Sequence, residues 1–564
     1  MDVYHKILGK YWGYPAFRPL QEDIIRSVCA GKDTLGLMPT GGGKSITFQV
    51  PALAMEGICL VVTPLIALMR DQVDNLRRVG IKATAVYSGM EYQEIAAELE
   101  ACVSGQYKFL YVSPERLATG FFKEKLQAMN VCLLVVDESH CISQWGYDFR
   151  PSYLHIADIR EQLPGVPVLA LTATATPEVV DEIQERLLFK EKNVFLKSFA
   201  RPNLAYIVRH TDNKQYTLSY ILGKVPGTAI VYTRNRKQTK DTALFLRQVG
   251  ISADFFHAGL SRKEKEIRQQ RWKNNECRVI VTTNAFGMGI DKPDVRLVVH
   301  LDMPGSLEEY FQEAGRAGRD SRKAFAVVLY TDIDNFLLKK RIENEFPEKS
   351  LIRQVYGSLE KYYPIQEEHG KEVIHEFSMV DFSSACGFFP LQVYHALNLL
   401  ELSGYIEYTE EEDESTFPAT ARITYTHPRL KKKDLVIPPS VYEERRERAK
   451  KRIEKVKEYM GRKDICRSRL LLAYFGEMDT KDCGCCDICL SKNDSGLTNR
   501  DFNAIRDRLL ELLSDRQSLP ASALNESLPF TEDKIVATVR FLAEHDERFY
   551  FKDGEIGMRG RLSF

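Results

Sequence analysis

The stretch "TLGLMPTGGGKSITFQVPALAM", residues 34–55, decides the fold class of this chain. It has the pattern of a short apolar strand, a glycine-rich turn and an apolar helix, in that order. Glycines let backbone N–H groups close around phosphate oxygens, and the N-terminus of the helix adds its positive dipole. The stretch therefore predicts a nucleotide phosphate loop. The predicted loop consists of Met38, Pro39, Thr40, Gly41, Gly42, Gly43, Lys44 and Ser45.

Two side chains at the end of this loop have chemical roles in such a site. Lys44 would reach the β- and γ-phosphates, and Ser45 would bind Mg²⁺. The strict pattern has Gly at the position of Met38, so a glycine-rich turn without function is the alternative interpretation. The strand before the loop and the helix after it favour the phosphate loop.

Short apolar runs alternate with helical stretches up to about residue 330. The runs "TLGLM", "ICLVVT", "KFLYVS", "CLLVVDE" and "VLALTAT" precede the segment "FARPNL" (residues 199–204), and "TAIVYT", "VIVTT", "LVVHLD" and "AVVLY" follow it. Continuous β-rich runs of this kind suit strands covered on both faces, in a parallel sheet with crossover helices. We therefore predict an α/β fold with two lobes in tandem, residues 1–200 and 201–345.

A second chemical motif, "VVDESHCISQWGYDFRPSY" (residues 135–153), follows one of these strands. Asp137 can hold Mg²⁺ through water, and Glu138 can polarise the attacking water. A solvated acidic loop is the alternative, but the phosphate loop on the same lobe favours catalysis. An aromatic and cationic cluster comes next, and polar residues between its rings argue against a plain hydrophobic core. The cluster consists of Trp145, Tyr147, Phe149 and Arg150.

The second lobe carries two arginines in "QEAGRAGRD", residues 312–320. Arg316 and Arg319 are three residues apart and would share one helix face. An arginine that faces the γ-phosphate stabilises transition-state charge, by roughly 10³–10⁵ in rate in known NTPases. A surface charge run is the alternative. If the arginines are catalytic, ATP bridges the cleft between the lobes and its hydrolysis can open or close it.

The composition bounds the class of protein. The chain has 564 residues, 44% of them hydrophobic and 28% charged, with a formal net charge of zero. This composition is typical of a soluble globular protein with several domains. Zero net charge favours no class of partner, so any nucleic-acid surface would be a local patch. We find no apolar run of membrane-spanning length and no signal peptide, and we expect a cytoplasmic location, nucleoid-associated if the source is bacterial.

The pattern changes after residue 345. Residues 346–428 have the helix, turn, helix and hairpin order of a winged helix, and residues 499–564 repeat that order. Between them, residues 429–469 carry sixteen Lys and Arg against seven Asp and Glu. The helix in this basic region is either a phosphate-binding rail that includes Arg452, Lys455 and Arg462, or a solvated face whose glutamates pair locally with the cations.

Five of the twelve cysteines crowd between Cys466 and Cys489. Four thiolates satisfy tetrahedral Zn²⁺, and a Cys-x-x-Cys spacing lets one turn supply two ligands. A disulfide framework is the rival interpretation, and the expected reducing compartment argues against it. We therefore predict a helical zinc-binding module at residues 429–498.

These motifs resemble the RecQ family of DNA helicases, within helicase superfamily two. The resemblance rests on "GYPAFRPLQEDII", "DESHCISQWGYDFRP", "VTTNAFGMGIDKPDVR" and "HLDMPGSLEEYFQEAGRAGRD", and it covers most of the chain to about residue 345 and again near 440–490. It implies two RecA-like lobes, with Tyr14, Arg18 and Gln21 at the adenine and His140 at ATP. The family pattern assigns zinc to Cys466, Cys483, Cys486 and Cys489, which leaves Cys485 as an extra thiol.

The resemblance also gives the aromatic cluster a role. Trp145, Tyr147 and Phe149 belong to the family's aromatic-rich loop and would stack on single-stranded bases, at roughly 1–3 kcal/mol per base. Because this loop continues directly from the acidic motif, strand occupancy can reposition the catalytic residues. One departure from the usual family arrangement is that a winged-helix-like segment lies between the second lobe and the zinc module.

We therefore expect an ATP-dependent DNA helicase that moves 3′ to 5′ on single strands and acts in repair or recombination. Its cofactors would be ATP, Mg²⁺ and Zn²⁺, and its partners single-stranded, forked or branched DNA; the sequence does not reveal whether a single-strand-binding protein joins them. The alternatives are a translocase or RNA helicase with the same motor, and a DNA-binding or tethering protein with little unwinding. The presence of Lys44, Asp137, Glu138, Arg316 and Arg319 argues against a vestigial ATPase.

Overall fold

The computed structural model covers the chain with short gaps. It describes residues 2–39, 41–87, 89–143, 149–286, 292–363, 374–411, 420–426, 430, 432, 434–491, 497, 499–514, 518–520, 523, 524, 527–546, 548–552 and 554–558. The chain divides into two compact units, residues 1–462 with 470–480, and residues 463–469 with 481–564. The predicted 429–498 module is therefore shared between the units. No helix in the described ranges is long and apolar enough to cross a membrane.

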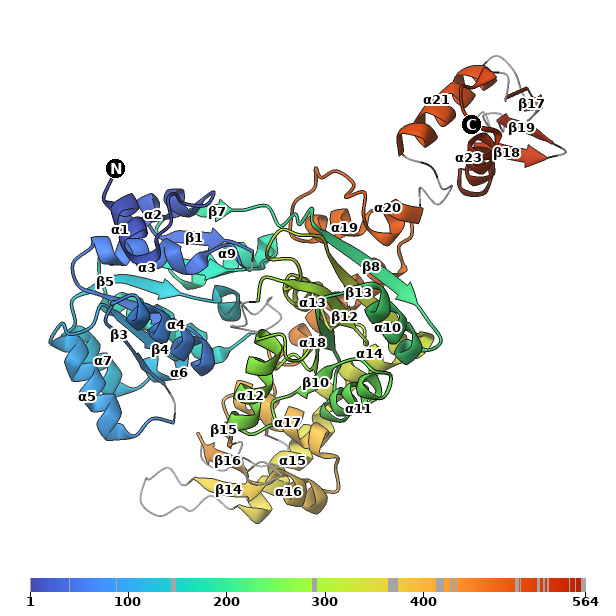
Figure 1. Cartoon of the computed structure of the whole chain (residues 1–564). Helices are drawn as coiled ribbons and strands as arrows, with labels where there is room; N and C mark the ends of the chain where they lie inside the picture. The colour runs from blue at the N-terminus through green and yellow to red at the C-terminus, as the bar shows by residue number, and fades with distance from the viewer. Residues whose placement is uncertain are drawn as a thin grey trace. The chain divides into compact units, whose positions relative to one another are not determined.

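The first lobe is a seven-stranded parallel sheet with the order β3-β4-β2-β5-β6-β1-β7 (Figure 1). The strands are β1 Thr34–Leu37, β2 Ile58–Val62, β3 Ala83–Val86, β4 Phe109–Val112, β5 Val131–Val136, β6 Val168–Thr172 and β7 Val194–Leu196. All residues of β1, β2, β4 and β6 are buried, because helices cover both faces of the sheet. This explains why these strands are continuous apolar runs.

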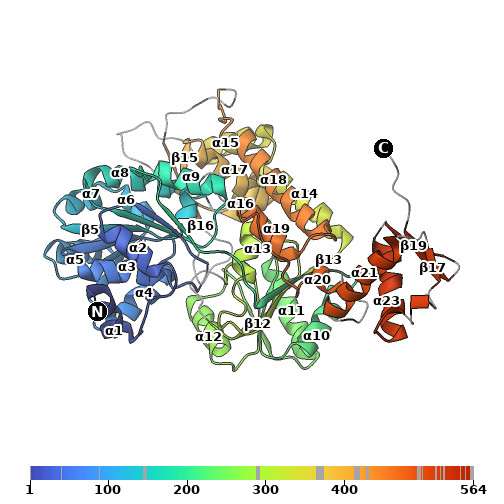
Figure 2. The ribbon, with the colours of Figure 1, turned by 90° about the horizontal axis from the view of Figure 1, so that it is seen from above.

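The helices of the first lobe form two layers, which Figure 2 shows from above. One layer packs α2, α3 and α4 on the sheet, and the other packs α5, α7, α8 and α9 on the opposite face. The bounds are α1 Val3–Trp12, α2 Gln21–Cys29, α3 Lys44–Ala54, α4 Ile66–Arg78, α5 Tyr92–Val103, α6 Pro114–Leu117, α7 Gly120–Gln127, α8 His155–Gln162 and α9 Pro177–Arg186. Two short 3₁₀ turns, η1 Ser139–Ile142 and η2 Pro151–Leu154, flank the aromatic-rich loop.

The second lobe is a six-stranded parallel sheet with the order β10-β11-β9-β12-β13-β8. The strands are β8 Leu204–His210, β9 Thr228–Tyr232, β10 Ala253–Phe256, β11 Val279–Thr282, β12 Val295–His300 and β13 Ala324–Tyr330. The helices are α10 Lys214–Lys224, α11 Arg236–Gln248, α12 Arg262–Lys273, α13 Leu307–Ala314 and α14 Asp332–Glu345. Two tandem parallel-sheet lobes confirm the predicted fold class. The prediction missed β3, β7, β8 and β10, which are outer strands of the sheets.

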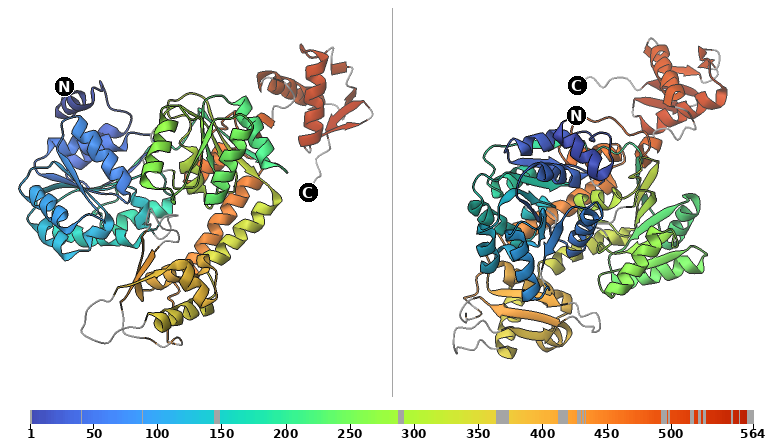
Figure 3. Two further views of the ribbon diagram at one scale, coloured as in Figure 1. Left: turned by 60° about the horizontal axis from the view of Figure 1, so that its bottom comes forward. Right: turned by 60° about the vertical axis from the view of Figure 1, so that its left-hand side comes forward.

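A three-stranded antiparallel sheet with the order β14-β16-β15 follows the second lobe. Its elements are α15 Lys349–Tyr362, β14 His375–Ser378, α16 Met379–Cys386, α17 Pro390–Leu402, β15 Ile406–Glu411 and β16 Thr420–Tyr425. The first strand pairs with the last strand of the hairpin, as in a winged helix. The basic helix α18 Glu443–Gly461 then returns beside α14, and Figure 3 (left) shows the two as a long pair, one orange and one yellow.

The second unit holds the cysteine cluster and another small domain. After α19 Arg467–Tyr474 and α20 Asp487–Ser491, the chain forms α21 Asn499–Ser514, β17 Ser518–Pro520, α23 Glu532–His545, β18 Phe549–Lys552 and β19 Glu555–Met558. The strand order β17-β19-β18 again pairs the first strand with the last, as the order β14-β16-β15 does. Its core consists of apolar side chains from the helices and the hairpin, such as Ile505, Val539 and Phe549.

Candidate nucleotide site and metal centre

The glycine-rich loop joins the carboxyl end of β1 to the N-terminus of α3. Gly41 and Gly43 have φ angles of 80° and 82°, in the left-handed region that favours glycine. A Cβ on Gly42 would lie 2.8 Å from the carbonyl oxygen of Pro39, so the turn is too tight for a side chain. The loop therefore presents its backbone, with Lys44 as the first residue of α3. Thr40 lies outside the described residues.

Two residues that the resemblance places at the adenine also bind this loop. The guanidinium of Arg18 donates to Gly41 O at 2.8 Å, and the side-chain amide of Gln21 donates to Gly43 O at 2.9 Å. A Cβ on Gly43 would overlap that amide. Arg18 and Gln21 therefore support the loop from the side of α2. Tyr14 is 51% exposed, so its ring is accessible to a base.

The acidic motif follows strand β5, which β6 separates from β1 in the sheet, and it faces the loop. Lys44 Nζ lies 3.7 Å from Glu138 Oε1, and the backbone N–H of Glu138 donates to Asp137 Oδ1 at 3.0 Å. Burial, together with the adjacent charge of Glu138, raises the pKa of Asp137 to about 6. Burial also disfavours ionised Glu138, but the positive charges of Lys44, His140 and Arg316 outweigh it and lower the pKa of Glu138.

Glu138 is held in an unusual conformation. Its φ of 47° and ψ of 45° lie in the left-handed region, which a non-glycine residue adopts at a cost of about 1–3 kcal/mol, mostly at functional sites. His140 Nδ1 lies 3.5 Å from Glu138 Oε2 and 2.9 Å from Thr172 Oγ1. His140 thus links the acidic motif to the end of β6, in the first lobe.

The two arginines of the second lobe follow α13 and reach this site. A Cβ on Gly41 would lie 3.5 Å from Cδ of Arg319, so the stem of Arg319 packs against the phosphate loop. Arg316 is buried, and its charge is one of those that lower the pKa of Glu138. The loop of one lobe and the arginines of the other therefore face each other.

The aromatic-rich loop is only partly described. Trp145 and Tyr147 lie outside the described residues, whereas Phe149 and Arg150 are placed. The Arg150 N–H donates to Cys141 O at 2.9 Å, which returns the chain to η1 directly beside the acidic motif. The guanidinium of Arg445 on α18 lies 5.4 Å from the centroid of the Phe149 ring. The end of the loop therefore contacts both the η1 turn beside the acidic motif and the basic helix.

The three residues of the predicted rail, on α18 and directly after it, lie in two different environments. Lys455 and Arg462 both approach Glu458, at 2.9 and 4.0 Å, as the local-pairing alternative expects. Arg452 instead lines a cavity of about 260 Å³ together with Arg150 and Arg316. Of the three predicted rail residues, Arg452 is therefore the one placed at the junction of the lobes.

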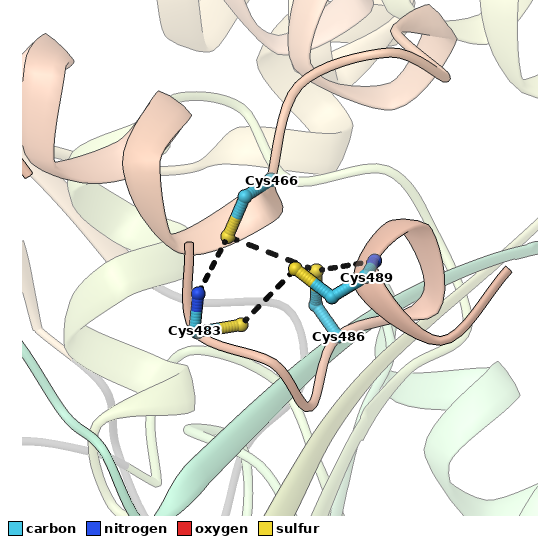
Figure 4. A group of neighbouring side chains, drawn as sticks. All are labelled: Cys466, Cys483, Cys486 and Cys489. Atoms are coloured by element: carbon cyan, nitrogen blue, oxygen red, sulfur yellow. Dashed lines mark hydrogen bonds between the residues drawn. The ribbon is translucent and has the colours of Figure 1, made fainter. Parts of the chain in front are cut away.

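Four cysteine sulfurs converge in the second unit, as Figure 4 shows. Cys466 Sγ lies 3.9 Å from Cys486 Sγ, and Cys483 Sγ lies 4.0 Å from Cys489 Sγ. Zn–S bonds of about 2.3 Å give a tetrahedron with edges of about 3.8 Å, so the set fits Zn²⁺. Backbone N–H groups of Cys483 and Cys489 also donate to neighbouring sulfurs. Cys485 is outside this set.

Sequence reasoning missed a residue pair beside the cysteines. Arg467 is buried and forms a two-pronged ion pair with Asp487, with Nε 3.0 Å from Oδ1 and Nη2 2.9 Å from Oδ2. Each partner directly follows a predicted zinc ligand, Cys466 or Cys486. That adjacency is the signal in the sequence that could have indicated the pair. The ion pair joins the two halves of the cluster and would orient the ligands.

Comparison with known proteins places this site in a family. Family models match as "DEAD/DEAH box helicase" over residues 18–183, "Helicase conserved C-terminal domain" over 213–321 and "RecQ zinc-binding" over 426–490. The last match and the sulfur geometry confirm zinc as a cofactor, and the ligand assignment remains a proposal. A solved structure of Saccharomyces cerevisiae Dbp5 bound to RNA and ADP BeF3 matches at a TM-score of 0.48 and 17% identity, over 60% of this chain and 90% of that chain. That match adds nothing to the assignment.

Two curated relatives decide the family. The ATP-dependent DNA helicase RecQ of Bacillus subtilis is 43% identical over 347 residues, which are 61% of this chain and 59% of the relative. The chain thus spans less than two thirds of that relative's length. The probable ATP-dependent DNA helicase RecS of Bacillus subtilis is 38% identical over 384 residues, 67% of this chain and 77% of the relative. This chain therefore belongs to the RecQ family of helicases.

Proposed function

We propose that this protein is an ATP-dependent DNA helicase that moves 3′ to 5′ on single-stranded DNA and unwinds duplexes in repair or recombination. The observation that carries the proposal is the meeting of three motifs at one site. Lys44 lies 3.7 Å from Glu138 on the first lobe, and Arg319 of the second lobe packs against Gly41. A vestigial site would have no reason to retain this arrangement of opposed charges.

The residues of this site divide the chemistry of ATP hydrolysis among them. Lys44 and the loop backbone would bind the phosphates, and Ser45 and Asp137 would hold Mg²⁺. Glu138 accepts a proton from the attacking water and orients it. Arg316 and Arg319 stabilise the charge that develops in the transition state. Because these groups lie on two lobes, hydrolysis and release change the lobe spacing, which is the step that moves the strand.

The DNA strand is expected to contact the aromatic-rich loop. Phe149 and Arg150 end this loop, and Trp145 and Tyr147 precede them in the sequence. Aromatic rings stack on any base, which suits a motor that moves along DNA without regard to sequence. Since the loop begins five residues after Glu138 and returns to η1, strand binding can adjust the acidic motif.

One comparison of substrates tests the proposal. With ATP and Mg²⁺, the protein is expected to unwind a forked DNA duplex, and single-stranded DNA is expected to stimulate its ATP hydrolysis. Preferential unwinding of a matched RNA duplex would identify an RNA helicase instead. DNA-stimulated hydrolysis without strand separation would identify a translocase or a tether. Absence of any ATP hydrolysis would refute the proposed function altogether.

A further inference from the structure

The segment between the zinc ligands Cys466 and Cys483 makes an unexpected contact with the first unit's interlobe connection. We call residues 470–480 the strap and residues 198–203 the hinge, because the hinge joins β7 of the first lobe to β8 of the second. Both belong to the first unit. The strap begins inside α19 and is far from the hinge in sequence, so only folding brings the two together.

One carboxylate of the strap, that of Glu477, accepts two hydrogen bonds from the hinge. Glu477 Oε1 accepts from the backbone N–H of Phe199 at 2.6 Å, and Oε2 accepts from the hydroxyl of Ser198 at 2.7 Å. The same Ser198 hydroxyl oxygen accepts from the backbone N–H of Ala200 at 3.2 Å. Glu477 therefore sets the conformation of three consecutive hinge residues.

Aromatic side chains of the strap also pack against the hinge and against α13. The buried ring of Phe475 lies 5.1 Å from that of Phe199 in the hinge and 5.0 Å from that of Phe311 on α13. Next to it, the Tyr474 hydroxyl lies 2.8 Å from Glu308 Oε1, also on α13. The strap thus holds the hinge against the helix that leads into the arginine segment.

The strap also touches the first lobe. Gly476 has a φ of 90°, and a Cβ there would lie 3.0 Å from Cγ of Pro177, the first residue of α9. Glycine suits both the backbone conformation and this close approach. The strap therefore contacts both lobes and the hinge between them.

The hinge in turn holds the segment that carries the two arginines. The guanidinium of Arg201 donates to the carbonyl oxygens of Gly315, Ala317 and Gly318, at 3.0, 2.7 and 3.1 Å. Arg316 lies between the first two of these residues, and Arg319 follows the third. The Asn203 side-chain amide adds a bond to Gly318 O at 2.7 Å. The hinge thus fixes the backbone that aims the arginines at the phosphate loop.

We propose that the strap is a positioning element for ATP hydrolysis, in which Glu477 fixes the hinge and the hinge, through Arg201, fixes the two arginines. Glu477 does not touch the nucleotide site, so it acts through Arg201 and is a positioning residue. The inference rests on the proposed ATPase. It adds that the segment between the zinc ligands controls the rate of hydrolysis, in addition to the motifs of the lobes themselves.

The test compares Glu477→Ala with two controls in the full chain. Glu477→Gln keeps one acceptor for Phe199 N and offers an amide donor to Ser198, and Asp479→Ala removes an exposed carboxylate from the same strap. We expect Glu477→Ala to lower the DNA-stimulated kcat by about tenfold or more while KM for ATP stays nearly constant, because small misplacements of catalytic groups are costly. Both controls should behave nearly as wild type.

A double variant separates positioning from general destabilisation. Arg201→Lys cannot reach three carbonyls with one ammonium, so it should lower kcat as well. If both residues act through the hinge, combining Arg201→Lys with Glu477→Ala lowers kcat little further than either alone. Additive losses would overturn the inference, as would an unchanged kcat in Glu477→Ala. A loss of kcat that tracks a fall in the thermal midpoint and in zinc content across the variants would also overturn it.

The same data distinguish this inference from the proposed function. If the wild-type protein hydrolyses no ATP with DNA present, the proposed function is refuted. If the wild type is active and Glu477→Ala is equally active, only the role of the strap is refuted.

Discussion

Replacing Glu138 with Gln tests the acidic motif most directly, because it removes a charge and keeps the shape. Glu138 Oε1 lies 3.7 Å from Lys44 Nζ, and both side chains are largely buried. At an effective dielectric constant of about 20, the attraction across that distance is about 4 kcal/mol. Desolvation of the two groups offsets most of it. ATP must displace this pairing when its phosphates take Lys44, so the pair opposes nucleotide binding in the wild type.

Two opposite effects are therefore expected in Glu138→Gln. Binding of a non-hydrolysable ATP analogue should be unchanged or tighter by up to about tenfold, which corresponds to a net loss of about 1.4 kcal/mol of the Lys44–Glu138 attraction. Hydrolysis should slow by about 10²–10⁴, the usual contribution of a positioned general base. Calorimetric titration measures the first effect, and single-turnover quenching with saturating single-stranded DNA measures the second.

The matched control is Glu185→Gln, the same change at an exposed position on α9. It should leave both measurements at the wild-type value. The reasoning is refuted if Glu138→Gln hydrolyses ATP at a rate close to wild type. If it instead loses nucleotide binding, the Lys44–Glu138 pair would be required to organise the empty loop, and the predicted competition between pair and phosphate would be wrong.

Three further predictions concern the arginines, the zinc site and the basic helix. Arg319→Ala should bind ATP normally but hydrolyse it about 10³-fold or more slowly; normal turnover would exclude it as the finger. Cys486→Ser should lose zinc by metal analysis, whereas Cys485→Ser should keep it, and the reverse result would overturn the ligand assignment. Arg452→Ala should flatten the plot of log DNA affinity against log salt by roughly one unit. The ammonium of Lys455 pairs with Glu458, so Lys455→Ala should leave that slope nearly unchanged.

The central strands of both lobes could be predicted from the sequence, and the outer strands could not. A strand such as β2 is buried on both faces, so burial itself requires a continuous apolar run. The edge strand β7 alternates exposed and partly exposed residues. In β10 the buried Asp254 interrupts the apolar pattern, and its charge is neutralised by Arg247 and Arg268. The cost of burying that carboxylate is offset by residues on other elements, so the local sequence pattern does not reveal the strand.

The catalytic groups follow the same division. The phosphate loop and the Asp137–Glu138 pair are local motifs, because backbone turns and strand ends position them within a few residues. The sequence by itself determined these groups, the cysteine spacing and the presence of two parallel-sheet lobes. The arginine motif predicts an approach to the phosphates, but the sequence does not show that the stem of Arg319 packs directly on Gly41, because that contact requires the lobes to face each other.

The contacts that join distant segments were decided by the tertiary structure alone. The bonds of Glu477 to the hinge link residues that are separated by 278 and 279 positions. An acidic residue in a polar segment has the same local pattern whether it is solvated or hydrogen-bonded to a backbone far away in sequence. What distinguishes the two cases is which surface folding brings opposite it, and that depends on the packing of both lobes at once.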